Sequence, residues 1–415
     1  MPNYNLSIQL ADRGNLLFDA YIYDGLRTPF GRHAGKLAAV RPDDMVAGVM
    51  KMLLQRAEIQ PEELEDVILG CACQAGEDSR NIARHALLLA GLPPSIPGVT
   101  VNRLCSSGMA AVADAARALS CGEGDLYLAG GVESMSRAPF VMGKAESAYS
   151  REIKMFDSSI GARFPNPAIT ALYGADTMPE TADNVARELG ISREDSDRFA
   201  LASQLKYKAA KDSGFYTDEV TPVTVPQGKK QAMVVAEDEH PRPDTTLDAL
   251  ARLKPLNSGG VVTAGSASGV NDGAAVLLVG NSAFGEKHGK KPLARILSAA
   301  AVGVEPRIMG VGPVRAIQKA LERAGRTLKE MDVIEINEAF ASQVLGCLKL
   351  LDIPFEDGRV NPNGGAIAVG HPLGASGARL TLTAVRQLLR SQGRYAVASL
   401  CVGMGQGLAI TLERC

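Results

Sequence analysis

The chain has 415 residues and a formal net charge of −2, from 44 Lys and Arg against 46 Asp and Glu. Hydrophobic residues make up 46% and charged residues 22%, which is typical of a globular protein and excludes a mainly disordered chain. The balanced charge argues against a dedicated nucleic-acid-binding protein, which carries a basic excess. A small anionic ligand stays possible, because one or two cations suffice to hold it. The length predicts two or three domains.

The sequence gives no sign of a membrane segment or an export signal. No run approaches the ~20 apolar residues that span a bilayer, and Asp12 and Arg13 fall where a signal peptide needs its apolar segment. We therefore expect a cytoplasmic protein. The seven cysteines are scattered and contain no C-x-x-C pair, which disfavours both a zinc site and a disulfide framework. Each is expected to be a small buried residue or a reactive thiol.

Strands and helices alternate in the first third of the chain, after an irregular extension at residues 1–16. In chain order, the patterns predict a strand at Leu17–Tyr23, a helix at Arg41–Arg56, a strand at Asp66–Cys73, a helix at Ser79–Ala90, a strand at Val99–Leu104, a helix at Ser106–Ser120 and a strand at Asp125–Ala129. This alternation is typical of an α/β sheet with parallel strands.

The middle of the chain, residues 133–269, is richer in Pro, Met and charge and is predicted to be an insertion. It contains expected helices at Thr181–Leu189 and Arg193–Asp212, and loop or edge-strand material at Val220–Pro243. The α/β alternation then returns. We expect strands at Ala274–Val279, Ala294–Ala300, Val333–Ile336 and Tyr395–Leu400, and helices at Val314–Ala324 and Ala378–Arg390. The recurrence in both halves suggests an internal duplication.

Cys105 is the first candidate for chemistry. It lies in the segment Val101–Ala111, where an expected strand runs into a helix of small residues. A sulfur at a helix N-terminus is close to unpaired N–H groups and the helix dipole, which predicts a lowered thiol pKa and a nucleophilic thiolate. The alternative is a cysteine that only packs at a strand–helix turn.

His371 is one of five histidines and lies in the glycine-dense segment Asn361–Arg379. Glycines permit close backbone approach, and an imidazole near its reference pKa is the usual general base for a thiol. The alternative is a buried histidine with a structural role.

Cys401 and Asn337 each end an expected strand. Cys401 is followed by alternating glycines, of which Gly403 has no side chain to obstruct its N–H as an oxyanion donor. A thiol can also act as acid and base near neutral pH. Asn337, in Ile334–Phe340, could hold a water or a carbonyl oxygen. The alternative for Cys401 is a strand-end cysteine followed by turn glycines, and the alternative for Asn337 is a cap of the next helix.

Together these motifs resemble the thiolase family. The resemblance spans residues 17–415 and includes the Cys105 segment, Ala129–Ser136, Thr263–Gly273, Asn337–Phe340, the His371 segment and Ser399–Gly407. It implies two duplicated halves, each a mixed sheet between helices, in a five-layered αβαβα core with an inserted loop domain. The implied division is an extension at 1–16, an N-terminal domain at 17–135 plus 270–290, a loop domain at 136–269 and a C-terminal domain at 291–415.

The resemblance also implies roles for single residues. Cys105 is the acylated nucleophile, His371 its base, and Cys401 the second acid and base. Asn337 would hold a water that completes one oxyanion hole with His371, and the N–H groups of Cys105 and Gly403 would form the other. The implied coenzyme A contacts are Arg242, Ala264, Ser268, Met309, Ala339 and Phe340. The sequence departs from one branch of the family at Thr177 and Ala249, where that branch has His and Ser.

Three further segments, Cys73–Val99, Ser136–Arg151 and Met178–Ala186, resemble the thiolases that cleave 3-oxoadipyl-CoA with coenzyme A to succinyl-CoA and acetyl-CoA. The resemblance implies coenzyme A as a substrate with no permanently bound cofactor, and a homodimer or homotetramer without nucleic-acid or membrane partners. Ala162 departs from an aromatic residue expected in that branch.

Three other activities are open. They are a broad acetyl-CoA acetyltransferase, a decarboxylating condensing enzyme, which typically has a second histidine in the place of Cys401, and a non-catalytic acyl-CoA carrier. A dicarboxylic substrate would need a cation for its far carboxylate, because an unpaired buried charge is costly. The candidate cations are Arg137, Lys144, Arg151 and Arg163.

Overall fold

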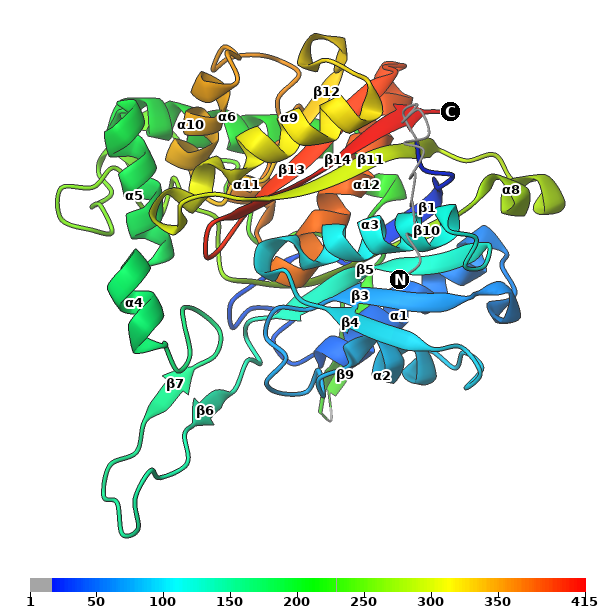
Figure 1. Ribbon diagram of the computed structural model, residues 1–415, viewed down its shortest axis with the longest axis horizontal. Coiled ribbons are helices and arrows are strands. Elements are labelled where there is room, and N and C mark those ends of the chain that lie inside the picture. The colour runs from blue at the N-terminus through cyan, green and yellow to red at the C-terminus, as the bar shows by residue number, and fades with distance from the viewer. Residues whose placement is uncertain (1–16, 229) are drawn as a thin grey trace, which may run out of the picture.

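One large mixed sheet organises the molecule, as a computed structural model shows for residues 17–228 and 230–415 (Figure 1). The extension expected at residues 1–16 lies outside the described residues. The strands are ordered β12-β13-β14-β11-β1-β10-β5-β3-β4, and β2 pairs with β10. Their bounds are β1 Tyr21–Arg27, β2 Gly31–Arg32, β3 Asp66–Gly70, β4 Gly98–Val101, β5 Leu126–Ser134, β10 Asn271–Gly280, β11 Ala294–Gly303, β12 Val333–Ile336, β13 Tyr395–Val402 and β14 Gln406–Arg414.

The sheet consists of two halves with the same strand pattern. In the first half, β1 is antiparallel to β10, β10 to β5, and β5 is parallel to β3. In the second, β11 is antiparallel to β14, β14 to β13, and β13 is parallel to β12. The halves join where Tyr21 pairs with Arg295. The expected α/β fold with two duplicated mixed halves is therefore confirmed.

Helices and sheets form five layers. Helices α1 (Pro42–Ala57) and α2 (Ile82–Leu89) cover the outer face of the first half, and α9 (Gly312–Ala324) and α10 (Ala341–Leu350) cover that of the second. Between the halves lie α3 (Ser107–Ser120) and α12 (Leu373–Ser391), which share one apolar core with both sheets. Small residues along α3 allow most of this helix to be buried in the central layer.

The two central helices touch through their backbones at their first turns. A Cβ atom placed on Gly108 of α3 would lie 2.4 Å from the Gly374 carbonyl oxygen of α12, and one on Gly377 would lie 2.4 Å from the Met109 nitrogen. Only glycine fits such an approach. The sequence segments of Cys105 and His371 are therefore brought together by direct contact between these helices.

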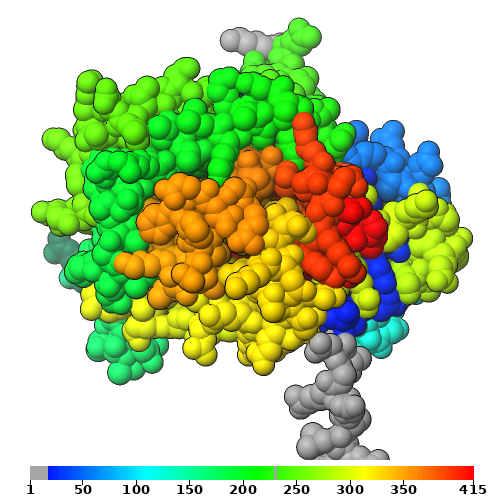
Figure 2. All heavy atoms as spheres, turned by 90° about the horizontal axis from the view of Figure 1, so that it is seen from above, coloured from blue at the N-terminus to red at the C-terminus, as the bar shows by residue number. Residues whose placement is uncertain are grey.

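The insertion leaves the core as an arm and returns as helices. Strands β6 (Phe140–Met142) and β7 (Met155–Asp157) form the arm, which extends away from the body in Figure 1. The helical segments, green in Figure 2, lie against the orange and red C-terminal segments. The remaining elements are α4 Pro167–Tyr173, α5 Met178–Leu189, α6 Arg193–Asp212, β8 Val223–Gln227, β9 Lys230–Val235, α7 Leu247–Ala251, α8 Ser282–His288 and α11 Ala366–Val369.

Most expected elements are present, with shifts at their ends. The first strand begins at Tyr21, four residues later than expected, and the segment expected as loop or edge strand contains the β8–β9 hairpin. Strand β14 and helix α10 were not predicted. In the part of the chain that the structure describes, no helix is both long and apolar enough to cross a membrane.

Candidate active site

Cys105 occupies a short turn, Leu104–Ser106, between β4 and α3. The turn is fixed from both sides, because the Leu104 N–H donates to Asn102 Oδ1 at 2.9 Å and the Ser107 hydroxyl donates to the Leu104 carbonyl at 2.7 Å. Leu104 has a φ of +45°, which is strained for a side chain of this size. This strained backbone holds Cys105 at the start of α3, where the sequence predicted it.

The thiol pKa of Cys105 differs from the expectation. Burial raises it to about 11, although hydrogen bonding to the backbone of Gly403 and of Cys105 itself opposes the shift. The prediction of a lowered pKa was therefore wrong, because the cost of placing a negative charge in a buried site exceeds the benefit of the helix end. The same two backbone groups were predicted as an oxyanion hole, and both lie beside the sulfur.

His371 precedes α12 and is held on three sides. Its backbone N–H donates to Asn271 Oδ1 at 2.8 Å, and its Nδ1 lies 2.6 Å from Ser376 Oγ. The Ser376 hydroxyl donates its own hydrogen to the Pro372 carbonyl at 2.9 Å, so it accepts a hydrogen from Nδ1. The other ring nitrogen, Nε2, therefore carries the lone pair.

Burial lowers the pKa of His371 to about 3, and the charge of Arg379 acts in the same direction. The imidazole is thus neutral at neutral pH, with the Nε2 lone pair free. Asn337, which follows β12, places its Nδ2 3.4 Å from His371 Nε2. Its buried Oδ1 has no hydrogen-bond partner among the described residues, so it has room for one more donor.

Cys401 lies in β13 and is fully buried. Burial raises its thiol pKa well above the usual value, and the nearby Cys105 and Cys347 add to the shift. Gly403 lies in the turn between β13 and β14, and a Cβ there would be 3.2 Å from Leu104 Cδ1. The structure therefore places Cys401, Gly403 and the Cys105 turn side by side.

These pKa values predict how Cys105 reacts with an alkylating agent. Because the thiol pKa is raised, the thiolate fraction of the free enzyme should increase about tenfold per pH unit at neutral pH. Labelling of the Cys105 peptide by iodoacetamide, measured by mass spectrometry, should rise from pH 6.5 to 9.5 without a plateau. The exposed Cys121 monitors the reagent in the same sample. A plateau already reached at pH 7 would show a thiolate–imidazolium pair instead.

The residues expected to bind coenzyme A fall into two groups. Met309, Ala339 and Phe340 are buried in one apolar cluster that also contains Cys401, and the Ser268 N–H donates to the Ala339 carbonyl at 2.9 Å. Ala264 and Arg242 are exposed. The first group thus lies beside the second thiol, and the second group lies at the surface.

Thr177, Ala249 and Ala162, the departures from family branches, have ordinary structural environments. Thr177 is the N-cap of α5, and its N–H donates to Glu180 Oε2 at 2.6 Å. Ala249 is exposed in α7, and Ala162 is exposed in the loop after β7. Thr177 therefore stabilises a helix start in this chain.

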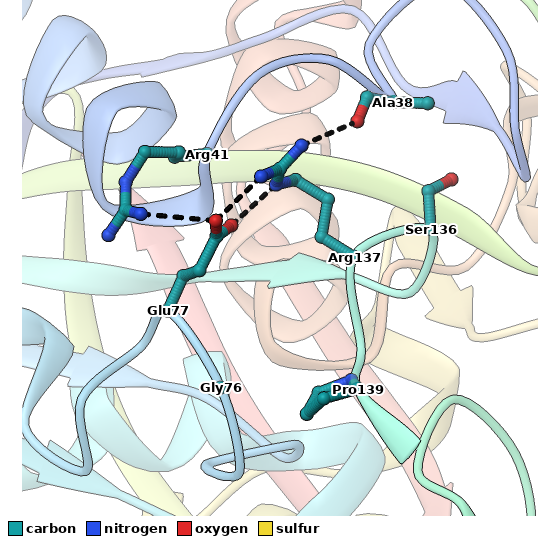
Figure 3. Close-up of a pocket in the computed structure, with 7 residues that line it drawn as sticks. All are labelled: Ala38, Arg41, Gly76, Glu77, Ser136, Arg137 and Pro139. Carbon is teal, nitrogen blue, oxygen red and sulfur yellow. Dashed lines mark hydrogen bonds and ion pairs between the residues drawn. The ribbon is translucent and has the colours of Figure 1, made fainter.

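Arg137 is unsuited to hold a substrate carboxylate, because it is already paired. It lines an open cavity of about 500 Å³ with Ala38, Arg41, Gly76, Glu77, Ser136 and Pro139 (Figure 3). Its Nη2 donates to Glu77 Oε1 at 2.6 Å, and Arg41 donates to the same oxygen at 3.0 Å. Glu77 therefore forms ion pairs with the guanidinium groups of both Arg137 and Arg41.

The other three candidate cations differ in position. Lys144 and Arg151 are exposed between the strands of the β6–β7 arm. Arg163 is half-buried, and its Nη2 donates to the Cys73 carbonyl at 2.9 Å. The adjacent Ala72 carbonyl accepts from Asn102, three residues before Cys105. Of the four, Arg163 has the shortest chain of contacts to the Cys105 turn.

Three residues that support the site were not predicted. Ser376 sets the hydrogen position on His371, and Asn271 holds the His371 backbone. Glu133 accepts N–H groups from Ala72, Cys73 and Gly374 at 2.9–3.0 Å, which ties the start of α12 to the segment after β3. Each of the three lies in a sequence motif named above, but the group that it binds can be seen only in the folded structure.

The duplicated α/β core places Cys105 and His371 just before its two central helices and Cys401 of β13 beside Cys105, an arrangement that suits an acyltransferase of the cysteine type. Among residues 17–228 and 230–415, no group of three or more His, Cys, Asp or Glu side chains could hold a metal ion.

Comparison with known proteins agrees with this class. The thiolase N-terminal domain model matches residues 20–283, and the thiolase C-terminal domain model matches residues 290–414. The chain is 57% identical over 398 residues to the beta-ketoadipyl-CoA thiolase of Pseudomonas aeruginosa, covering 95% of this chain and 99% of that protein. It is 56% identical, with the same coverage, to the 3-oxoadipyl-CoA/3-oxo-5,6-dehydrosuberyl-CoA thiolase of Escherichia coli.

A solved structure, the Bacillus anthracis acetyl-CoA acetyltransferase, superposes with a TM-score of 0.90 at 37% identity, covering 97% of this chain and all of that one. The chain belongs to the thiolase family.

Proposed function

We propose that this thiolase cleaves 3-oxoadipyl-CoA with coenzyme A to succinyl-CoA and acetyl-CoA. The observation that carries the substrate is the 57% identity to the beta-ketoadipyl-CoA thiolase over 95% of the chain, against 37% for the acetyl-CoA acetyltransferase structure. The thiolase fold does not separate these two activities, so it supports the reaction class and leaves substrate choice to the acyl pocket.

The first half-reaction transfers the acyl group to Cys105. Neutral His371 takes the thiol proton through Nε2, and the sulfur attacks the 3-oxo carbon. The bond between C2 and C3 then breaks, and its electron pair goes to the enolate of acetyl-CoA. The Cys401 thiol donates its proton to the enolate carbon. Its raised pKa supports this role, because the thiol is protonated at neutral pH.

The second half-reaction restores the enzyme. The Cys401 thiolate takes the proton of incoming coenzyme A, whose sulfur attacks the Cys105 thioester. The Cys105 sulfur leaves and regains its proton from protonated His371. The acyl group moves between two thioesters of similar free energy, so the step is reversible. All protons are exchanged among these side chains and coenzyme A, and the mechanism requires no permanently bound cofactor.

Two groups of donors serve the two developing oxyanions. We assign the N–H groups of Cys105 and Gly403 to one, because both lie beside the Cys105 sulfur. We assign His371 and a water on Asn337 to the other. The unpartnered Asn337 Oδ1 and the 3.4 Å approach of its Nδ2 to His371 support this choice.

The two groups of coenzyme A residues suit different parts of the substrate. We assign Met309, Ala339, Phe340 and Ser268 to the pantetheine, because the first three share one apolar cluster with Cys401 and Ser268 is bonded to Ala339. Arg242 is assigned to the nucleotide, because its exposed cation matches the phosphates. Ala264 is assigned to the channel entrance.

The substrate is tested by comparing two 3-oxoacyl-CoA compounds. Purified protein with coenzyme A should consume 3-oxoadipyl-CoA with a higher kcat/KM than acetoacetyl-CoA, measured as loss of enolate absorbance. A preference for acetoacetyl-CoA would instead identify a broad acetyltransferase. No turnover of either compound, in protein that binds coenzyme A, would point to a carrier.

Arg163 is predicted to bind the far carboxylate of the substrate. Arg163→Ala should lower kcat/KM for 3-oxoadipyl-CoA roughly 10- to 150-fold, because a charge-assisted hydrogen bond contributes ~1.5–3 kcal/mol. The kcat/KM for acetoacetyl-CoA, which lacks this carboxylate, should stay within about threefold.

Lys144→Ala is the matched control, since Lys144 is exposed on the arm and should leave the substrate ratio unchanged. If Arg163→Ala lowers both substrates equally, its contact with the Cys73 carbonyl is structural and the carboxylate is bound elsewhere.

We also propose that copies of the chain associate, as a homodimer or homotetramer. Exposed apolar side chains on the arm support this, with Phe140 69%, Tyr149 99% and Ile153 72% accessible. The edge strand β4 and the exposed Leu88 and Leu89 of α2 offer a second surface for association.

We further propose the domain division at 17–135 plus 270–290, 136–269 and 291–415. The β6–β7 arm belongs to the middle domain.

A further inference from the structure

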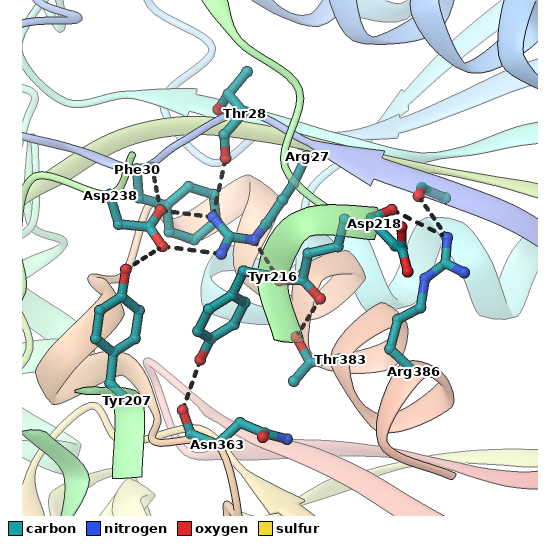
Figure 4. Close-up of polar contacts among 12 residues, drawn as sticks. Arg27, Thr28, Phe30, Tyr207, Tyr216, Asp218, Asp238, Asn363, Thr383 and Arg386 are labelled. Atoms are coloured by element: carbon teal, nitrogen blue, oxygen red, sulfur yellow. Dashed lines mark hydrogen bonds and ion pairs between the residues drawn. The ribbon is translucent and has the colours of Figure 1, made fainter. Parts of the chain in front are cut away.

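Arg27 is a fully buried arginine at the end of β1, far from the thiols in sequence, and the reaction does not use it. Its guanidinium lies between the rings of Phe30 and Tyr216, with its carbon 5.2 and 5.3 Å from their centroids. Its Nε donates to Glu219 at 2.6 Å, and its other two nitrogens donate to Asp238 at 2.6 and 3.0 Å (Figure 4).

Asp238 accepts four hydrogen bonds in all from the described residues. Besides the two from Arg27, it accepts the Phe30 N–H at 2.8 Å and the Tyr207 hydroxyl at 3.1 Å (Figure 4). The next residue, Glu239, is bonded to the same part of the chain. Its N–H donates to the Phe30 carbonyl, and its Oε2 accepts the Lys36 N–H at 2.9 Å. The segment is therefore immobilised at residues 238–239.

The immobilised segment leads directly to Arg242. His240 is packed so closely on Gly269 that a Cβ there would lie 2.3 Å from the imidazole Cε1. The Arg242 N–H then donates to Gln204 Oε1 at 2.9 Å, and Gln204 donates to the Ile367 carbonyl at 3.2 Å. The Arg242 side chain projects from this fixed backbone and is exposed.

We propose that Arg27, acting through Asp238, is a positioning residue that sets the Asp238–Arg242 segment for the nucleotide part of coenzyme A. A cation on an immobilised backbone loses less conformational entropy on binding than one on a flexible loop. The buried ion pair of Arg27 and Asp238 therefore increases affinity without touching the ligand. This inference rests on the proposed role of Arg242 and adds the group that fixes it.

The test compares coenzyme A with pantetheine, which lacks the nucleotide. Asp238→Asn keeps the size of the side chain and removes the charge that pairs with Arg27. We expect its calorimetric affinity for coenzyme A to fall about tenfold, equivalent to ~1.4 kcal/mol, and its affinity for pantetheine to stay unchanged. In thiolysis, the KM for coenzyme A should rise by the same factor while kcat stays within about threefold.

Glu219→Gln is the matched control, because Glu219 is the other carboxylate on Arg27 but contacts Thr383 of α12 instead of the Asp238 segment. It should lower the Tm and leave the ratio of the two affinities unchanged. The proposal is overturned if Glu219→Gln changes the ratio as Asp238→Asn does, if Asp238→Asn weakens pantetheine equally, or if the wild type binds both ligands equally.

The binding measurement needs no turnover. A wild type that prefers coenzyme A to pantetheine but cleaves no 3-oxoacyl-CoA would contradict the proposed function. The affinity ratio of Asp238→Asn would still decide the role of Arg27.

Discussion

Incubation with acetyl-CoA is expected to add one acetyl group to the Cys105 peptide, detected by mass spectrometry. Cys105→Ala should lose this modification and lower thiolysis by at least ~10³-fold, because no other group supplies the covalent intermediate. Cys105 is partly accessible, unlike the fully buried Cys401, so an acyl group can reach its sulfur first.

Cys347→Ala is the control, because Cys347 is buried near Cys401 and donates only to the Gly310 carbonyl. It should be acetylated on Cys105 as the wild type is. An acetyl group that persists on the Cys105→Ala protein would place the nucleophile at another thiol.

The two variants His371→Ala and Cys401→Ala should fail at different steps. His371→Ala removes the base for Cys105 and should slow acyl-enzyme formation at least ~10²-fold. Cys401→Ala keeps that base and should still acetylate from acetyl-CoA, although more slowly than the wild type because the departing coenzyme A loses its proton donor. It should lose thiolysis by at least ~10²-fold, because the enolate has no proton donor. Single-turnover acylation and steady-state thiolysis separate the two steps.

The conservative variant Ser376→Ala tests the hydrogen on His371. It removes the acceptor for the Nδ1 hydrogen without changing either thiol, so acylation should slow less than in His371→Ala.

Near-normal thiolysis by Cys401→Ala would show that another group donates the proton to the enolate.

The sequence predicted elements whose signal is local. Helix α6 has the expected bounds, Arg193–Asp212, because Ser192 and Asp195 form a capping box at its start. Strand β14 was missed because its apolar run follows a turn in which Met404 and Gly405 have positive φ, and the turn glycines there were not followed to a second strand. The hairpin signal was present in the same residues.

The sequence predicted which residues form the candidate site, but it did not predict the thiol pKa of Cys105 or the hydrogen bonds that orient His371. The position of Cys105 before α3 follows from the strand–helix pattern, but its thiol pKa depends on burial, which is a property of the packed chain. Ser376 lies five residues after His371 and has an ordinary sequence context. Its hydrogen bond depends on the path of the backbone through the first turn of α12.

The contact between the first turns of α3 and α12 also bears on how such an enzyme can diverge. Backbone atoms, not side chains, set the spacing there, since Cβ atoms on Gly108 or Gly377 would overlap the opposite main chain. Arg163 and the β6–β7 arm belong to a separate stretch of sequence that can mutate without altering this spacing. On the proposed role of Arg163, selection can therefore adjust the acyl chain that is accepted while the reaction itself is inherited unchanged, and chimeras that exchange only residues 136–269 should inherit the donor's substrate preference.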